Sequence, residues 1–225
     1  MRPTLMAILL MASPLLASQK DVVRRLDESA TVLSEIMASP DKGIPEDLLE
    51  KAHCIVIVPG LKKGAFLVGG KYGKGFLSCR QKNNAGWSAP AAIRVEGGSV
   101  GFQIGGSETD VVMLIMNESG ANKLLSSQFT LGGEGQVAAG PVGRTASAET
   151  DAKMRAEILS WSRSRGVFAG IALQGATLRQ DVEDNEALYG KRLDNREVVT
   201  THVAPPVAAN RLMSALNKYS PKERS

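Results

Sequence analysis

The sequence has little of what many functional sites require. It contains two histidines and two cysteines in 225 residues, and neither pair shows a zinc-binding spacing such as CxxC or HExxH. We therefore predict no metal site, and no cofactor. Aromatic residues make up only 4% of the chain and form no recognisable RNA-binding signature, so nucleic acid is not an expected partner.

Long apolar runs are also missing, apart from a short one at the start. Residues 1–18 carry one positive charge and then an apolar run that Pro14 interrupts and that ends in Ala17 and Ser18. The run is too short to span a bilayer, and small residues at its end suit signal-peptidase cleavage. We interpret residues 1–18 as an export leader, the alternative being a buried N-terminal helix. The mature chain, residues 19–225, is then expected to be one domain, periplasmic or secreted and peripheral to a membrane.

The two cysteines, Cys54 and Cys79, can oxidise to a single disulfide in such a compartment. Closing a loop of this length would stabilise the fold by about 3 kcal/mol in the chain-entropy model. The alternative is that both are plain buried thiols, because the geometry of pairing cannot be read from the sequence.

The apolar spacing predicts helices at both ends of the chain and strands between them. Residues 21–38 place apolar side chains three and four residues apart, and residues 44–52 begin with proline and two acids, as short helices do. From there to about residue 115, strand-like runs such as CIVIVPG, GAFLVGG and GFLSCR are punctuated by glycine. Strands that come in runs favour an α+β fold, with an antiparallel, glycine-rich barrel or sandwich-like sheet and terminal helices packed against it.

Two glycine-rich motifs bear only a partial likeness to known functional loops. GKYGKG is not a nucleotide-binding loop, because Gly75 stands where a hydroxyl would meet magnesium and no helix pattern follows. Gly97–Gly101 matches the GxSxG nucleophile elbow, with Ser99 as the serine. An elbow needs a strand that turns sharply into a helix, whereas the residues that follow indicate more strand. A serine hydrolase is therefore the least favoured interpretation, and we predict no catalytic residue.

Acidic residues are absent from one long stretch, residues 51–95. The same stretch holds eight basic residues: Lys51, Lys62, Lys63, Lys71, Lys74, Arg80, Lys82 and Arg94. Since the whole chain has a net charge of +4, the rest of it is net negative and the positive charge is concentrated here. A local field of this sign attracts anionic partners, and each Lys or Arg near an anionic bilayer contributes about 1 kcal/mol. The alternative is a solvated basic face with no ligand.

Seven fragments, in order along residues 21–219, resemble the SYLF domain, a lipid-binding and actin-associated module. They are IPEDLLEKA, KKGAFLVGGKYGKG, GWSAPAAI, SVGFQIGG, TLGGEGQVAAGPVGR, SRSRGVFAGIALQGATL and ALYG. The resemblance implies a compact β-rich scaffold that binds rather than catalyses. It also implies lipid contact through basic residues and an N-terminal amphipathic helix, and association with actin filaments. Because the helix at residues 21–38 lacks strong positive charge, we expect the lipid contact to shift to the basic stretch.

We therefore predict a non-enzymatic, exported protein that docks on the head groups of anionic phospholipids at a membrane surface. The residues expected to attract head groups are Lys62, Lys63, Lys71, Lys74, Arg80 and Lys82. Trp87 is a candidate interfacial anchor, with packing between strands as the alternative. A function of another class, a structural or protein-interaction platform in the cell envelope, is the competing hypothesis.

Overall fold

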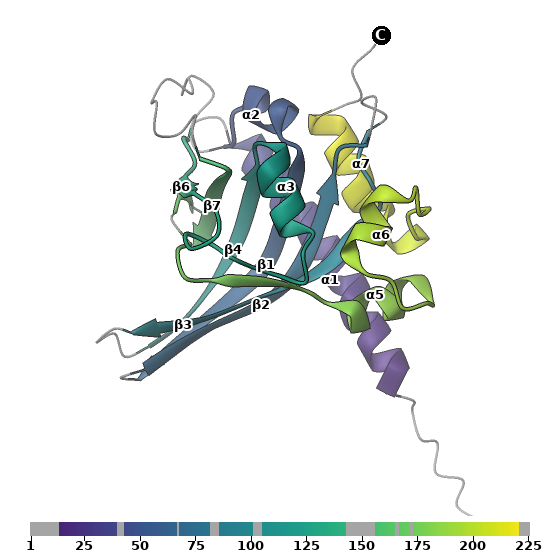
Figure 1. Ribbon diagram of the computed structural model, residues 1–225, viewed down its shortest axis with the longest axis horizontal. Helices are drawn as coiled ribbons and strands as arrows, with labels where there is room; N and C mark the ends of the chain where they lie inside the picture. The colour runs from purple at the N-terminus through teal and green to yellow at the C-terminus, as the bar shows by residue number, and fades with distance from the viewer. Residues whose placement is uncertain are drawn as a thin grey trace, which may run out of the picture.

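The computed structural model shows a mixed α+β fold in which helices from both ends of the chain pack against one curled sheet (Figure 1). The structure describes residues 14–39, 43–66, 68–81, 86–100, 105–142, 156–164, 167–171 and 173–220. This architecture confirms the fold class that the order of helical and strand patterns predicts.

Helices lie at both ends of the described chain. They are α1 (Pro14–Ala38), α2 (Glu46–Lys51), α3 (Glu118–Leu124), α5 (Val182–Tyr189), α6 (Asn195–Thr200), the 3-10 turn η2 (Val207–Ala209) and α7 (Asn210–Tyr219). Because α1 begins at Pro14, it runs through the junction at which the leader would be cleaved, and the leader stays a prediction. Among the described helices, none combines the length and the hydropathy that a membrane span requires.

Nine described strands form one sheet in the order β5-β9-β3-β2-β1-β4-β7-β6, and β8 pairs with β7. The strands are β1 (Cys54–Phe66), β2 (Val68–Cys79), β3 (Ala91–Val100), β4 (Gly105–Ile115), β5 (Gln128–Thr130), β6 (Val137–Ala139), β7 (Ile158–Ser164), β8 (Val167–Gly170) and β9 (Thr177–Gln180). All of these pairings are antiparallel except that of β6 with β7.

The central strands are fewer and longer than the sequence pattern indicates. β1 continues through Pro59 and Gly60 because a β-bulge takes up the extra residues, and Gly60 adopts the left-handed φ of +60° that the bulge requires. The turn from β1 to β2 falls inside GAFLVGG, since Phe66 pairs with Val68. A run that the pattern predicts as one strand is therefore the end of a long hairpin.

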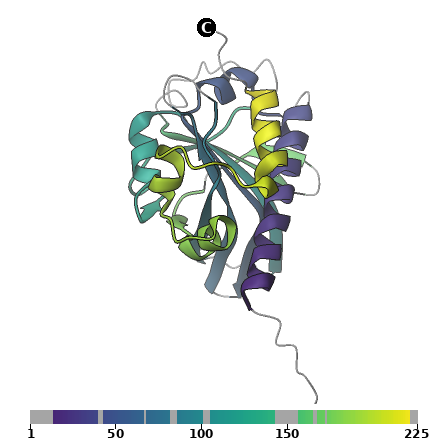
Figure 2. The same cartoon turned by 90° about the vertical axis from the view of Figure 1, so that its right-hand side faces the viewer.

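At its base the sheet carries an apolar core on each face. On one face α1 and α7 lie side by side (Figure 2), and Leu26 and Leu33 of α1 join a buried cluster with Phe76 of β2. On the other face Val56 and Leu77 belong to a second cluster, together with residues of α3, α6 and the β5–β9 end of the sheet. The apolar spacing of α1 thus has the packing role that an amphipathic helix on a sheet is expected to have.

Beyond this core the four central strands extend away from the helices (Figure 1). We call this part the distal end and define it as residues 62–66 of β1, 68–72 of β2, 96–100 of β3 and 105–108 of β4. At the opposite end of the β1–β2 hairpin, Cys54 and Cys79 are register partners and are joined by a disulfide. The hairpin is therefore covalently joined at both ends, by the disulfide at its base and by the chain itself at its tip.

Candidate functional site

Three of the cations expected to attract head groups lie at the distal end. In the β1–β2 register Lys63 stands directly opposite Lys71, and Lys62 stands opposite Tyr72. Because successive side chains of a strand point to opposite faces, Lys63 and Lys71 share the face away from α1 and Lys62 points to the α1 side. None of the three lysines forms an ion pair with any residue that the structure describes.

Lys63 and Lys71 are like charges in direct cross-strand opposition, an arrangement that destabilises a sheet. Partial burial lowers the pKa of Lys71, and repulsion from Lys63 lowers it further. On β4 the register partner of Lys63 is Ser107, an exposed hydroxyl. An anion that contacts both lysines would remove their repulsion, so this lysine pair is suited to bind a negatively charged group.

Lys74, three residues further along β2, has a different environment. Its Nζ lies 2.7 Å from Oδ2 of Asp181 and 3.0 Å from Oδ1 of Asp184, and both aspartates are almost fully buried. Asp184 also accepts a hydrogen bond of 2.6 Å from Arg25 of α1. Burial acts to lower the pKa of Lys74, but the hydrogen bonds to Asp181 and Asp184 outweigh it and the pKa is raised. Lys74 therefore links β2, α5 and α1 through ion pairs within the chain, and the head-group role expected for it stays a prediction.

Arg80 and Trp87 belong to the base of the sheet. Trp87 is 5% exposed, and its Nε1 donates a hydrogen bond of 3.1 Å to the carbonyl of Ser220, just after α7. Arg80 stacks over the Trp87 ring at 4.2 Å and donates to the same carbonyl at 3.2 Å. The two side chains hold the end of α7 in place, which is the packing between elements that stood as the alternative for Trp87. The head-group role of Arg80 and the interfacial role of Trp87 stay predictions.

The remaining sequence predictions concern Lys82, Ser99 and the absence of a metal site. Lys82 lies outside the described residues. Ser99 is a β3 residue paired with Gly69, so the chain continues as strand where a nucleophile elbow would turn into a helix. Among the described residues, no cluster of three or more His, Cys, Asp or Glu side chains is placed to hold a metal ion.

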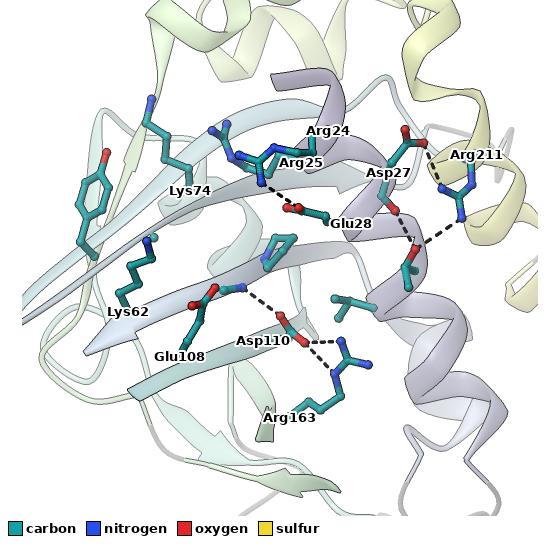
Figure 3. Close-up of a pocket in the computed structure, with 16 residues that line it drawn as sticks. Arg24, Arg25, Asp27, Glu28, Lys62, Lys74, Glu108, Asp110, Arg163 and Arg211 are labelled. Atoms are coloured by element: carbon teal, nitrogen blue, oxygen red, sulfur yellow. Dashed lines mark hydrogen bonds and ion pairs between the residues drawn. The ribbon is translucent and has the colours of Figure 1, made fainter. Parts of the chain in front are cut away.

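A polar groove of about 580 Å³ lies between α1 and the facing side of the sheet (Figure 3). Its lining includes Arg24, Asp27 and Glu28 of α1, Lys62 of β1, Tyr72 and Lys74 of β2, Glu108 and Asp110 of β4, Arg163 of β7 and Arg211 of α7. The sequence gives no signal for this groove, because its charges come from segments far apart along the chain.

Most charges in the groove neutralise one another. Asp110 accepts a hydrogen bond of 2.7 Å from Nε of Arg163 and one of 2.9 Å from the backbone N–H of Gly60, which the β1 bulge turns toward it. Arg24 pairs with Glu28 at 3.0 Å within α1. These pairs fix the walls of the groove and leave little unpaired charge for a ligand.

Lys62 and Glu108 differ from the rest of the lining. They are register partners on β1 and β4, yet neither forms an ion pair within the described part of the chain. The charge pattern along the chain gives no signal for Glu108, because Glu108 lies 46 positions after Lys62 and becomes its neighbour only through the β1–β4 register. Lys62 and Glu108 therefore present one charge of each sign on the α1 side of the sheet without neutralising each other.

Comparisons with known proteins agree with a binding role. A family described as "Ysc84: Las17-binding protein actin regulator" matches residues 96–219. The chain is 36% identical over 180 residues to LAS seventeen-binding protein 3 of Saccharomyces cerevisiae, covering 78% of this chain and 39% of that protein. It is 30% identical over 215 residues to SH3 domain-containing YSC84-like protein 1 of Mus musculus, covering 94% of this chain and 63% of that protein.

The chain thus spans about two fifths of the yeast relative and somewhat under two thirds of the mouse relative. The likeness covers the four central strands and most of the helices. The rest of each relative has no counterpart in the matched region.

Proposed function

Because the chain belongs to the Ysc84 (SYLF) family, we propose that it is a non-catalytic binding module that associates with anionic phospholipid surfaces through Lys63 and Lys71. The observation that carries the proposal is the unneutralised lysine pair on one face of the distal end. Two adjacent cations with no anionic partner in the described chain attract phosphate groups, and their mutual repulsion falls when an anion lies between them.

The state of α1 supports placing the contact at the distal end rather than on the N-terminal helix. The apolar residues Val22 and Leu26 are buried in the core, and Arg25 is paired with Asp184. A lipid contact led by the apolar face of α1 would first have to remove the helix from the sheet. The distal lysines need no such rearrangement.

The test is co-sedimentation of the protein with vesicles of phosphatidylcholine alone and with vesicles that also contain phosphatidylglycerol, at low and high salt. We expect binding only to the anionic vesicles, and weaker binding at high salt, because salt screens exposed charges. Replacing Lys63→Glu and Lys71→Glu together should weaken binding by at least about tenfold, given the contribution of each lysine near an anionic surface.

The matched control is Lys191→Glu with Lys218→Glu, which changes the net charge equally at two exposed positions outside the sheet, one just after α5 and one in α7. Equal binding by the two double variants would contradict the assignment of the site. Equal binding of the wild-type protein to neutral and anionic vesicles would contradict the proposal of a charged contact.

The names of the relatives favour a second candidate, a protein-interaction role of the Las17-binding or actin-regulating kind. For this role we expect co-sedimentation with actin filaments, or capture by a Las17-type partner, in the absence of vesicles. If the wild-type protein binds neither kind of vesicle but binds such a partner, the protein-interaction role replaces the lipid-binding role.

A further inference from the structure

One side of the distal end is bare. On the side that faces α1, Glu96 of β3 is partly exposed, and seven other described positions of the distal end are exposed. We call these positions the open face: Lys62, Gly64, Gly70, Tyr72, Gly98, Gly106 and Glu108. Neighbouring positions that point to the other side, such as Leu61 and Thr109, are buried. The side that faces α1 is therefore open at these positions, three of which also line the groove beside α1. The other side is buried next to the core and partly exposed at Lys63 and Lys71.

Four glycines make the open face flat. Gly64 pairs with Gly106 on one side and with Gly70 on the other, and Gly70 pairs with Gly98, so the four form one row across four strands. None of the four has a positive φ, and a β-carbon at Gly64 or Gly98 would meet nothing within 4 Å. The packing of the fold therefore does not require glycine at these two positions. Glycine weakens a strand and often marks a place where another backbone approaches closely.

Beside this row lie Lys62 and Glu108, which do not neutralise each other, and Glu96, whose charge is paired with Arg94 and Arg179. Lys62 and Glu108 are register partners without an ion pair in the described chain, and Tyr72, 50% exposed, is the β2 neighbour of Lys62. The open face is thus close to neutral but carries both signs side by side. A uniformly anionic bilayer attracts such a face only weakly, because the attraction of the cation is offset by repulsion of the anion. A second copy of the same face is complementary to it in charge.

We propose that the open face is a contact surface between two copies of this chain. A two-fold axis parallel to the strands and between β1 and β4 sets Lys62 of each copy against Glu108 of the other, so that both charge pairs form at once. The same axis sets Gly64 against Gly106, where the missing side chains allow the two sheets to come close. The ring of Tyr72 supplies apolar contact at the edge.

The small area of the open face makes the expected association weak. Four strands spaced about 4.8 Å apart and about five residues long make a face of roughly 15 Å by 17 Å, or about 250 Å². This area is well below the roughly 800 Å² per partner of a standard stable interface. Pairing is therefore expected at high protein concentration. Since Lys63 and Lys71 point to the side opposite the open face, the dimer leaves both lysine pairs accessible, on its two outward faces.

Charge reversal at the two positions tests the proposal by sedimentation equilibrium over a range of protein concentrations at low salt. Lys62→Glu puts Glu against Glu across the interface, and Glu108→Lys puts Lys against Lys. Each variant alone should self-associate at least about tenfold more weakly than the wild-type protein. In an equimolar mixture of the two variants every contact again joins opposite charges, so association should return to near the wild-type level.

Lys191→Glu is the control for an exposed charge reversal elsewhere, and it should self-associate as the wild-type protein does. Thermal unfolding followed by circular dichroism shows whether each variant is folded. The proposal is overturned if the wild-type protein is a monomer throughout, if either variant alone associates as strongly as the wild type, or if the mixture stays monomeric while both variants are folded.

Discussion

At the base of the sheet Lys74 and Arg80 are part of the fold, whereas at the distal end Lys63 and Lys71 have no anionic partner among the described residues. Lys71 and Lys74 are three positions apart on the same strand and come from the same acid-free stretch. Burial and repulsion lower the pKa of Lys71, while hydrogen bonds to two buried aspartates raise that of Lys74 against the effect of burial. The side chains are chemically identical, so their surroundings account for the difference.

The comparison shows why a basic stretch is an incomplete guide to a binding site. Asp184, which holds Lys74, is 110 positions away in the sequence, and Ser220, which holds Arg80, is 140 positions away. A count of charge along the chain treats these cations as equivalent to Lys63. Packing converts some of them into structural links and leaves others available for an external anion.

The largest effect should come from removing the charge of Lys74. Lys74→Met leaves Asp181 without its cation in a buried position, and breaking a buried ion pair from one side costs about 3 to 5 kcal/mol in the free energy of unfolding. Urea denaturation measures this difference. Lys63→Met, the matched change at the distal end, should alter the free energy of unfolding by no more than about 0.5 kcal/mol. Similar losses of unfolding free energy in both variants would show that Lys74 supports the fold no more than Lys63 does.

The disulfide separates the stability of the base from binding at the distal end. Cys54→Ser with Cys79→Ser should lower the free energy of unfolding by about 3 kcal/mol, since the bridge closes a loop with a sequence separation of 25. Thermal unfolding of the variant, and of the wild-type protein with and without a reducing agent, measures the loss. Vesicle binding well below the unfolding temperature should stay unchanged. A variant that keeps full stability would show that the disulfide does not support the base.

The smallest effect is the order in which the two lysines lose their protons. The lowered pKa of Lys71 means that its charge opposes folding below that pKa, and this penalty disappears as pH rises toward the ordinary value of 10.5. The raised pKa of Lys74 means that its contribution is complete below 10.5 and is lost as pH rises through the raised value.

An NMR titration of the lysine side chains should therefore show Lys71 losing its proton before Lys74. Lys63→Ala should move the pKa of Lys71 only part of the way back, because burial, the larger cause, remains. If Lys74 lost its proton at a lower pH than Lys71, the expected order of the two pKa values would be wrong.

Much of the fold was predictable from local pattern. The three- and four-residue spacing of α1 and the strand-like runs near residues 54–60 and 75–80 reflect which side chains face the core, and periodicity records that directly. The merging of runs into long strands was not predictable, because the bulge at Gly60 and the end of β1 at Phe66 are set by pairing between strands and not by local spacing. The position of Glu108 beside Lys62 was not predictable for the same reason, because the two residues are neighbours only through the β1–β4 register.

By itself, the sequence determined the class of the fold, the concentration of positive charge between residues 51 and 95, and the membership of a binding family. These depend on composition, order and local spacing, which a chain carries without folding. Only the tertiary structure decided which cations remain available, and which side of the distal end is bare. The reason is that ion pairing and exposure depend on distance and burial, which arise only when segments far apart in the chain are brought together.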